Sequence, residues 1–341
     1  MAESITYKCP SCGGVLIFDT ESGKLKCTQC DTQITIEEAQ VKQEESKQEQ
    51  QQDFMQYKCS SCGAEILTDE NTTATICSFC GSPTLIKDRL VGQASPKYVI
   101  PFEVSRKQME QKFREWAKKG HFTPKEFLRQ STIDKITGLY APYWLFDYHV
   151  DAYLEAHCTR IHTEVKKDIE YTYTDHFNVV RELGINYDKL PLDASKRLDN
   201  EMMDKLEPFD YSDLKDFSMQ YLSGFQSEKY DETSQDLKER GQRRIRNYAT
   251  TTAEKTIGAY STVNIVKNQI DMKEKSIDYA LLPVWILNYK YQGKNYTFAL
   301  NGQTGKIVGN RPIAKGNVVK WYGLVFSITT IIAMLIGGLI L

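Results

Sequence analysis

Much of the middle of the chain alternates between apolar and polar residues. From Tyr143 to Cys158, apolar or aromatic residues take every second position, which places them on one face of a long β-strand. Strand-like patterns also cover Ile169 to Val180, Thr262 to Met272 and Leu282 to Tyr291. The Gly- and Asn-containing segment Asn301 to Lys306 predicts a turn. These segments favour antiparallel strands joined by turns.

Helical periodicity is confined to other segments. Within Ser105 to Lys118, apolar residues recur at i, i+4, i+7 and i+8 and form one helical face. Thr123 to Glu126 reads as a capping box, so a second helix is expected to begin near Pro124. Further helices are expected around Leu198 to Leu206 and over Ser227 to Thr256. Together with the strands, these helices predict an α+β domain over residues 90–312.

The last part of the chain is apolar. Residues 321–341 contain no charged side chain over 21 positions. As a helix they would rise about 31 Å, close to the thickness of a hydrocarbon core of about 30 Å. Aromatic residues open this segment, and lysines of the basic juxtamembrane segment 313–320 precede it. A buried core helix is the alternative. We expect one transmembrane helix that anchors the protein by its tail to the cell membrane, with the N-terminal bulk in the cytoplasm.

Eight of the nine cysteines form an internal repeat. Each block reads C-x2-C-x14-C-x2-C, and the second block repeats the first at an offset of 50 residues. Gly13 and Gly63 follow the second cysteine of each block, where the chain must bend sharply. The predicted metal ligands are Cys9, Cys12, Cys27 and Cys30 in the first block, and Cys59, Cys62, Cys77 and Cys80 in the second.

This spacing is typical of zinc ribbons, in which two knuckles on short hairpins surround one ion with four thiolates. Two small β zinc ribbons are therefore expected at residues 1–36 and 54–89, joined by a flexible polar linker over 37–53, with two structural Zn²⁺ ions as cofactors. Disulfides are one alternative, and iron or an iron–sulfur cluster is another. Because four cysteines fill a tetrahedral site, no position is left for a substrate.

Charge and motif content argue against several other functions. The chain has 43 Lys and Arg against 45 Asp and Glu, and neither ribbon carries a basic surplus, so nucleic acid is an unlikely partner. His149 and His157 lie too far apart on one strand to share a metal. Cys158 belongs to the apolar row and is expected to be a core residue. No phosphate loop, nucleophile elbow or zinc-protease motif occurs, so no enzymatic activity is expected.

Several features together resemble a known family. They are the paired cysteine blocks, the segments Tyr140 to Phe146 and Leu282 to Trp285, the segment Asn301 to Lys306, and an apolar C-terminus. This order resembles the bacterial YdjG-like family of zinc-ribbon membrane proteins. The resemblance implies a gene beside a homologue of phage shock protein A and a role in envelope stress. It implies no catalytic residue.

The resulting functional hypothesis is an adaptor for protein–protein interaction. The ribbons and the central domain would dock cytosolic and membrane proteins encoded nearby, among them a homologue of phage shock protein A, and concentrate them at membrane lipid. The alternative is a membrane-associated zinc-ribbon protein that binds nucleic acid.

Overall fold

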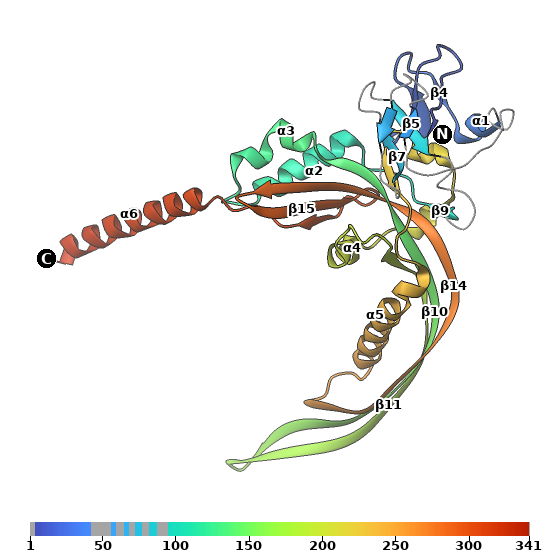
Figure 1. Cartoon of the computed structure of the whole chain (residues 1–341). Coiled ribbons are helices and arrows are strands. Elements are labelled where there is room, and N and C mark those ends of the chain that lie inside the picture. Colours follow the sequence, from blue (N-terminus) through green and yellow to red (C-terminus); the bar gives the residue numbers. More distant parts are fainter. Residues whose placement is uncertain are drawn as a thin grey trace. The chain divides into compact units, whose positions relative to one another are not determined.

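A computed structural model describes residues 4–41, 56–58, 65–67, 72–76, 82–86 and 95–340 (Figure 1). Its strands are β1 (Ser4–Ile5), β2 (Leu16–Asp19), β3 (Lys24–Cys27), β4 (Gln33–Ile34), β5 (Gln56–Lys58), β6 (Glu65–Leu67), β7 (Thr72–Ile76), β8 (Pro83–Ile86), β9 (Tyr98–Val99), β10 (Thr137–Lys166), β11 (Ile169–Asp193), β12 (Lys215–Asp216), β13 (Gln226–Glu228), β14 (Thr262–Tyr291), β15 (Lys294–Asn301) and β16 (Ile307–Gly309). Its α-helices are α1 (Ile36–Val41), α2 (Arg106–Lys118), α3 (Gln130–Ile133), α4 (Asn200–Leu206), α5 (Ser234–Lys255) and α6 (Lys315–Ile340). Short 3-10 helices are η3 (Lys125–Leu128), η4 (Tyr211–Asp213) and η5 (Met219–Leu222).

The chain divides into two compact units, each built from separate segments of sequence. Unit 1 contains residues 1–141, 198–229 and 281–341, and unit 2 contains residues 142–197 and 230–280. The long strands β10 and β14 contribute residues to both units. The chain therefore enters unit 2 twice and returns to unit 1 each time.

Unit 1 carries a mixed sheet and an aromatic core. The first residues of β10 pair in parallel with β13, and the last residues of β14 pair antiparallel with β15, which continues to β16. The rings of Phe102, Tyr140, Phe225 and Trp285 contact one another, and Phe102 stacks on Phe225 with 4.1 Å between ring centroids. The turn predicted at Asn301 to Lys306 is confirmed, since it joins β15 to β16.

Helix α2 confirms the amphipathic helix predicted from Ser105. Its buried residues are Met109, Phe113 and Ala117, and the Phe113 ring meets Phe298 of β15 edge-on at 5.0 Å. Ser105 and Gln108 form a capping box at its N-terminus. The capping box predicted at Thr123 is wrong, because Pro124 precedes a 3-10 helix that has no side-chain cap.

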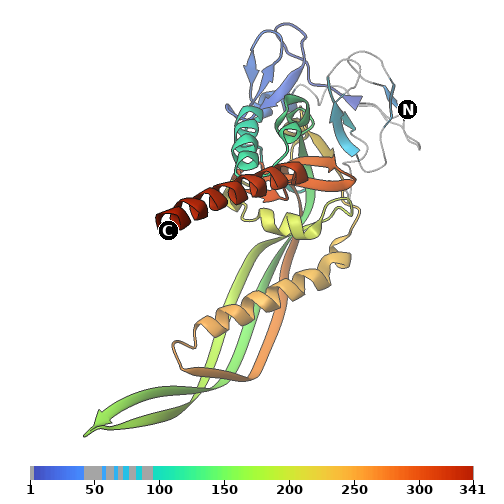
Figure 2. The same ribbon diagram turned by 90° about the vertical axis from the view of Figure 1, so that its left-hand side faces the viewer.

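Unit 2 consists of long antiparallel strands with one helix against them. Strand β11 pairs with β10 from Tyr143–Asp193 to Lys166–Ile169, and β14 lies on the other side of β10. Helix α5 lies along this sheet (Figure 2) and buries Leu237, Ile245 and Ala249 against Phe146 and Leu192. The prediction for Cys158 is confirmed: it is 1% exposed and packs with Ala253.

A β-bulge in unit 2 brings a lysine between two carboxylates. The β10–β11 register shifts between Phe146 and Tyr148, and Lys189 takes a left-handed conformation with φ of 57°. Its Nζ atom lies 2.9 Å from Asp147 Oδ2 and 3.0 Å from Asp278 Oδ2. These three side chains are largely buried, so the ion pairs tie β10, β11 and β14 together.

The predicted fold class is wrong in two respects. The described chain is mostly β-sheet with few helices, rather than α+β. The predicted transmembrane helix over 321–341 is also wrong. Among the described residues, no helix combines the length and the apolar character needed to cross a membrane. The predicted tail anchor and the single-pass location at the cell membrane are corrected with it.

Helix α6 carries polar residues at several positions along its length. The helix begins at Lys315, and its first two turns contain Asn317 and Lys320. Further along, the hydroxyl groups of Ser327, Thr329 and Thr330 donate to carbonyl oxygens one turn earlier, at 2.8 to 3.0 Å. These residues are polar positions within a helix that is otherwise mainly apolar.

Candidate metal centre

The first cysteine block folds into a small sheet with two knuckles, which we call ribbon 1 (residues 4–41). Strand β2 pairs with β3 from Leu16–Cys27 to Asp19–Lys24, and β3 pairs with β4. One knuckle precedes β2 and carries Cys9 and Cys12, while the other begins at the last residue of β3, Cys27, and continues to Cys30. The hairpin therefore brings together two cysteine pairs that are separated in sequence.

The four sulfur atoms converge on one point. Cys9 Sγ lies 3.6 Å from Cys30 Sγ, and Cys12 Sγ lies 3.5 Å from Cys27 Sγ. All four lie within 4.8 Å of one another. A tetrahedral site with Zn–S bonds of about 2.3 Å needs sulfur separations of about 3.8 Å, whereas a disulfide needs about 2.05 Å. The four cysteines thus fit one metal ion, and all four are free thiols.

Each sulfur accepts a hydrogen bond from the residue two positions later. The backbone N–H groups of Ser11, Gly14 and Gln29 each donate to a cysteine sulfur at 3.4 Å. Cys30 Sγ lies 3.1 Å from the hydroxyl of Thr32. Hydrogen bonds of this kind stabilise negative charge on sulfur and orient the ligands before a metal arrives.

The two knuckles use the same backbone bend with different residues. Gly13 follows Cys12 with φ of 73°, and Asp31 follows Cys30 with φ of 57°. Asp is one of the few residues besides Gly that tolerates this left-handed conformation. From the sequence, the bend was expected at Gly13 and Gly63, and no role was predicted for Asp31 and Thr32. Their positions after Cys30, equivalent to those of Gly13 and Gly14 after Cys12, were the available signal.

The thiol pKa values are set by these hydrogen bonds. Burial raises the pKa of Cys9, but donation from the backbone N–H groups of Ser11 and Cys12 outweighs it and lowers the pKa to about 6. Hydrogen bonds from Thr32 lower the pKa of Cys30. The backbone N–H of Gly14 lowers the pKa of Cys12, but hydrogen bonding with the other thiols raises it to about 12. A bound cation would displace the protons that remain on the sulfurs.

Ribbon 1 is attached to the rest of unit 1 through the segment around η5. The Ser223 hydroxyl donates to the Leu16 carbonyl at 2.8 Å, and the Phe18 N–H donates to the Ser223 carbonyl at 3.0 Å. The rings of Phe18 and Tyr221 meet edge-on at 5.4 Å. Metal binding that stabilises the hairpin should therefore also stabilise the contact between β2 and the segment around η5.

A cavity of about 520 Å³ lies beside ribbon 1. Ribbon 1 contributes residues 17–21 and Lys26, and apolar walls come from Ile136, Phe225 and Trp285. Asp19, Glu21 and Asp134 place carboxylates around it, together with Lys26 and Lys107. The cavity therefore combines an apolar floor with charges of both signs.

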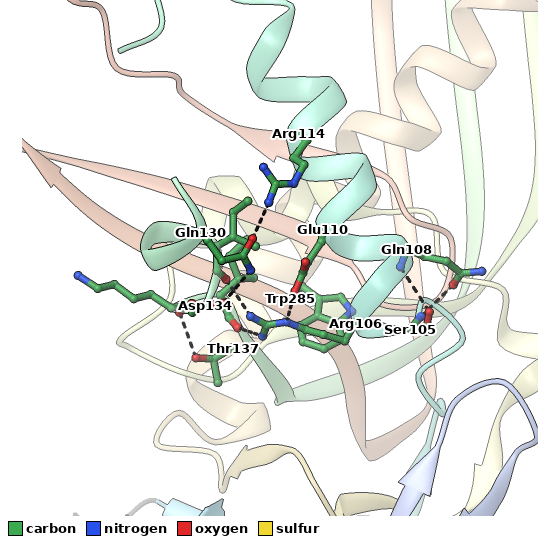
Figure 3. A network of polar contacts seen from close by, with 12 residues as sticks. Ser105, Arg106, Gln108, Glu110, Arg114, Gln130, Asp134, Thr137 and Trp285 are labelled. Atoms are coloured by element: carbon green, nitrogen blue, oxygen red, sulfur yellow. Dashed lines mark hydrogen bonds and ion pairs between the residues drawn. The ribbon is translucent and has the colours of Figure 1, made fainter. Parts of the chain in front are cut away.

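The floor of this cavity is held by Arg106 (Figure 3). Its guanidinium donates to the carbonyl oxygens of Ile133, at 2.8 Å, and of Ile136, and pairs with Glu110 at 3.1 Å. It also lies over the Trp285 ring. Because these partners engage its donors, Arg106 acts as a support for the cavity rather than as a free cation.

The other predicted ligands, Cys59, Cys62, Cys77 and Cys80, lie outside the described residues. Among the described residues, the four cysteines of the first block form a cluster whose ligand atoms lie close enough together to hold a metal ion. The structure thus supports one metal site, formed by four cysteines that leave no coordination position open.

Comparison with known proteins identifies the family. The chain is 43% identical over 338 residues to the protein named "Uncharacterized protein YdjG" of Bacillus subtilis (strain 168). The aligned region covers 98% of this chain and 99% of that protein. The chain belongs to the YdjG family. The resemblance predicted from the sequence is thereby confirmed. No family model and no solved structure matches this YdjG-family chain.

Proposed function

We propose that this chain is a zinc-dependent adaptor that docks a partner protein in the cavity beside ribbon 1. The observation that carries the proposal is the convergence of four cysteine sulfurs in a hairpin that also lines this cavity. With all coordination positions filled by protein, the metal has a structural role. An apolar floor with charged groups around it is the arrangement that recognises protein segments.

Zinc is the metal we propose. Four thiolates favour Zn²⁺ or iron, and two of the ligands, Cys12 and Cys30, are exposed. Zn²⁺ has no redox chemistry that exposure would disturb. Since the second cysteine block repeats the spacing of the first, we propose a second Zn²⁺ there, held by Cys59, Cys62, Cys77 and Cys80.

The partner that we propose to test first is a homologue of phage shock protein A, as the family resemblance implies. Zinc content of the purified full chain would be measured, followed by its binding to that protein by isothermal titration calorimetry. We expect about two zinc ions per chain if both sites fill. Cys12→Ser should lose one ion and weaken binding, whereas Ser11→Ala, beside the ligand, should do neither.

A second pair of variants tests the cavity itself. Ile76 lines the cavity and Ile313 does not, although both side chains are exposed. Ile76→Lys should weaken partner binding without loss of zinc, and Ile313→Lys should leave it unchanged. Equal binding by both variants would contradict docking in this cavity. Salt-dependent binding to DNA, with no binding to the protein, would instead favour the nucleic-acid alternative.

A further inference from the structure

The hairpin formed by β10 and β11 continues beyond the rest of unit 2. Figure 2 shows both strands running past the end of α5. Strand β14 begins at Thr262, whose hydroxyl lies 2.6 Å from that of Thr159 on β10. Beyond this point the described chain places no strand beside β10 on that side, so β11 is the strand with which residues 160–166 pair.

The direction of the backbone groups on this edge can be derived from the last contacts with the β14 side. The Ile161 N–H donates to the Ser261 hydroxyl at 2.9 Å, and the Ser261 N–H donates to the Thr159 carbonyl at 2.8 Å. Backbone groups of alternate residues point the same way in an antiparallel ladder. The N–H and C=O groups of Thr163 and Val165, and the C=O of Ile161, therefore point away from β11.

The exposed edge lacks some of the features that usually protect an edge strand. It has no proline and no bulge, and it ends in a tight turn at Lys167 and Asp168 with φ of 46° and 63°. Ile161 and Val165 expose their apolar side chains on one face. Such edges are ready to pair with another strand.

The sequence of the edge is complementary to itself about Thr163. In an antiparallel pair centred on this residue, Thr163 faces Thr163, and Ile161 faces Val165. The backbone groups of these residues point away from β11. One register therefore forms the hydrogen bonds between the two copies and also places apolar side chains opposite each other. On the other face, His162 faces Glu164. Within one copy, His162 Nδ1 lies 3.6 Å from Asp175 Oδ2, and Glu164 pairs with Lys166 at 2.8 Å. Arg160 would face Lys166, but its guanidinium lies over the rings of Phe177 and Tyr260, at 5.4 Å from each centroid.

We infer that two copies of this chain associate through antiparallel pairing of their β10 edges, with the two-fold axis at Thr163. The joined hairpins form a continuous four-stranded sheet in which Ile161 of each copy packs against the partner's Val165. Because the contact covers only the end of a hairpin, the dimer is weak and depends on concentration. This inference does not depend on the adaptor function.

Sedimentation velocity of the zinc-loaded full chain over a range of concentrations tests the inference. Thr163→Pro removes an outward N–H on β10, while Thr172→Pro makes the same change at the residue directly opposite on β11. We expect the native chain and Thr172→Pro to form the dimer and Thr163→Pro to remain monomeric. Neither N–H belongs to the β10–β11 ladder, and circular dichroism would verify that the hairpin is retained.

A second pair of variants avoids any backbone change. Val165→Lys should weaken the dimer at least tenfold, because it places a charge opposite the partner's Ile161. Ile169→Lys, an equally drastic change at an exposed site on the other face, should leave it intact. A native chain that is monomeric at every concentration would overturn the inference. So would equal loss of the dimer in Val165→Lys and Ile169→Lys, or a dimer that survives Val165→Lys and Thr163→Pro.

Discussion

Ribbon 1 and unit 2 obtain their stability from different sources. Ribbon 1 has a short hairpin over a few buried side chains such as Leu16 and Leu25, and its four cysteine sulfurs meet at one point. Unit 2 buries two clusters of apolar side chains between long strands and α5. A unit as small as ribbon 1 buries too little apolar surface to fold unaided. The comparison teaches that one part of the chain should depend on a metal and the other on packing.

Removing the metal should produce the largest difference between the two regions. Chelation, or Cys12→Ser, should abolish hydrogen-exchange protection in residues 4–41, because structural zinc supplies about 10 to 16 kcal/mol of folding free energy in small zinc domains. Protection in residues 143–193 should remain. Acid should act in the same direction, since protonation of the thiolates releases the metal. Loss of protection in both regions together would break the comparison.

The buried ion pairs should give the next largest effect, confined to unit 2. Lys189→Met leaves Asp147 and Asp278 with an uncompensated buried charge, which costs about 3 to 5 kcal/mol. Denaturant unfolding of unit 2 would measure the loss, and zinc content should be unchanged. Lys205→Met, at an exposed pair with Glu201, is the control and should cost less than about 1 kcal/mol.

The same ion pairs predict how unit 2 responds to pH. Burial raises the pKa of Asp147, but hydrogen bonds from Ser276 and Lys189 and the charge of Lys189 outweigh it and hold the pKa below its ordinary value of 3.8. Burial lowers the pKa of Lys189, but its two carboxylate partners raise it above 10.5. Asp147 therefore contributes stability above pH 3.8 that is lost as the pH falls below that value. Lys189 contributes stability below pH 10.5 that is lost as the pH rises above it. A pH series of unfolding curves should show both losses in the native chain. In Lys189→Met the alkaline loss should disappear, and the acid loss should become smaller without disappearing, because the Ser276 hydroxyl and the backbone N–H of residue 189 still donate to Asp147.

A cavity in the apolar core of unit 2 should cost somewhat less. Ile245 is fully buried between α5 and the strands, so Ile245→Ala should lower the free energy of unfolding by about 2 to 5 kcal/mol. Arg246→Ala, at the exposed neighbour, should change it little. Chemical denaturation followed by the near-ultraviolet signal of Trp144 would report the difference. A cost for Ile245→Ala below that of Arg246→Ala would contradict the assigned packing.

The smallest expected effect concerns the start of α5. Thr233 and Asp236 form a capping box, with the Thr233 N–H donating to Asp236 Oδ2 at 2.8 Å. Thr233→Ala should cost about 1 kcal/mol, and Thr233→Ser should retain most of the stability. The midpoint of thermal unfolding would rank the two variants. Equal stability of Thr233→Ala and the native chain would show that packing alone positions α5.

Features with a short period or a fixed spacing could be predicted from the sequence. The apolar row from Tyr143 to Cys158 predicted the strand, and the periodicity after Ser105 predicted α2. The fold class was missed, because the strands run far beyond their alternating segments: β10 extends from Thr137 to Lys166. Beyond residue 158 the hairpin is exposed on both faces, so no apolar row marks it.

By itself, the sequence determined the spacing of Cys9, Cys12, Cys27 and Cys30, and thereby the capacity for one site of four sulfurs, because two residues between cysteines suffice to form a knuckle. Only the tertiary structure decided that Lys189 meets Asp147 and Asp278, residues 42 and 89 positions away. Local geometry follows from neighbouring residues, whereas these contacts depend on the register between strands that lie far apart in the chain.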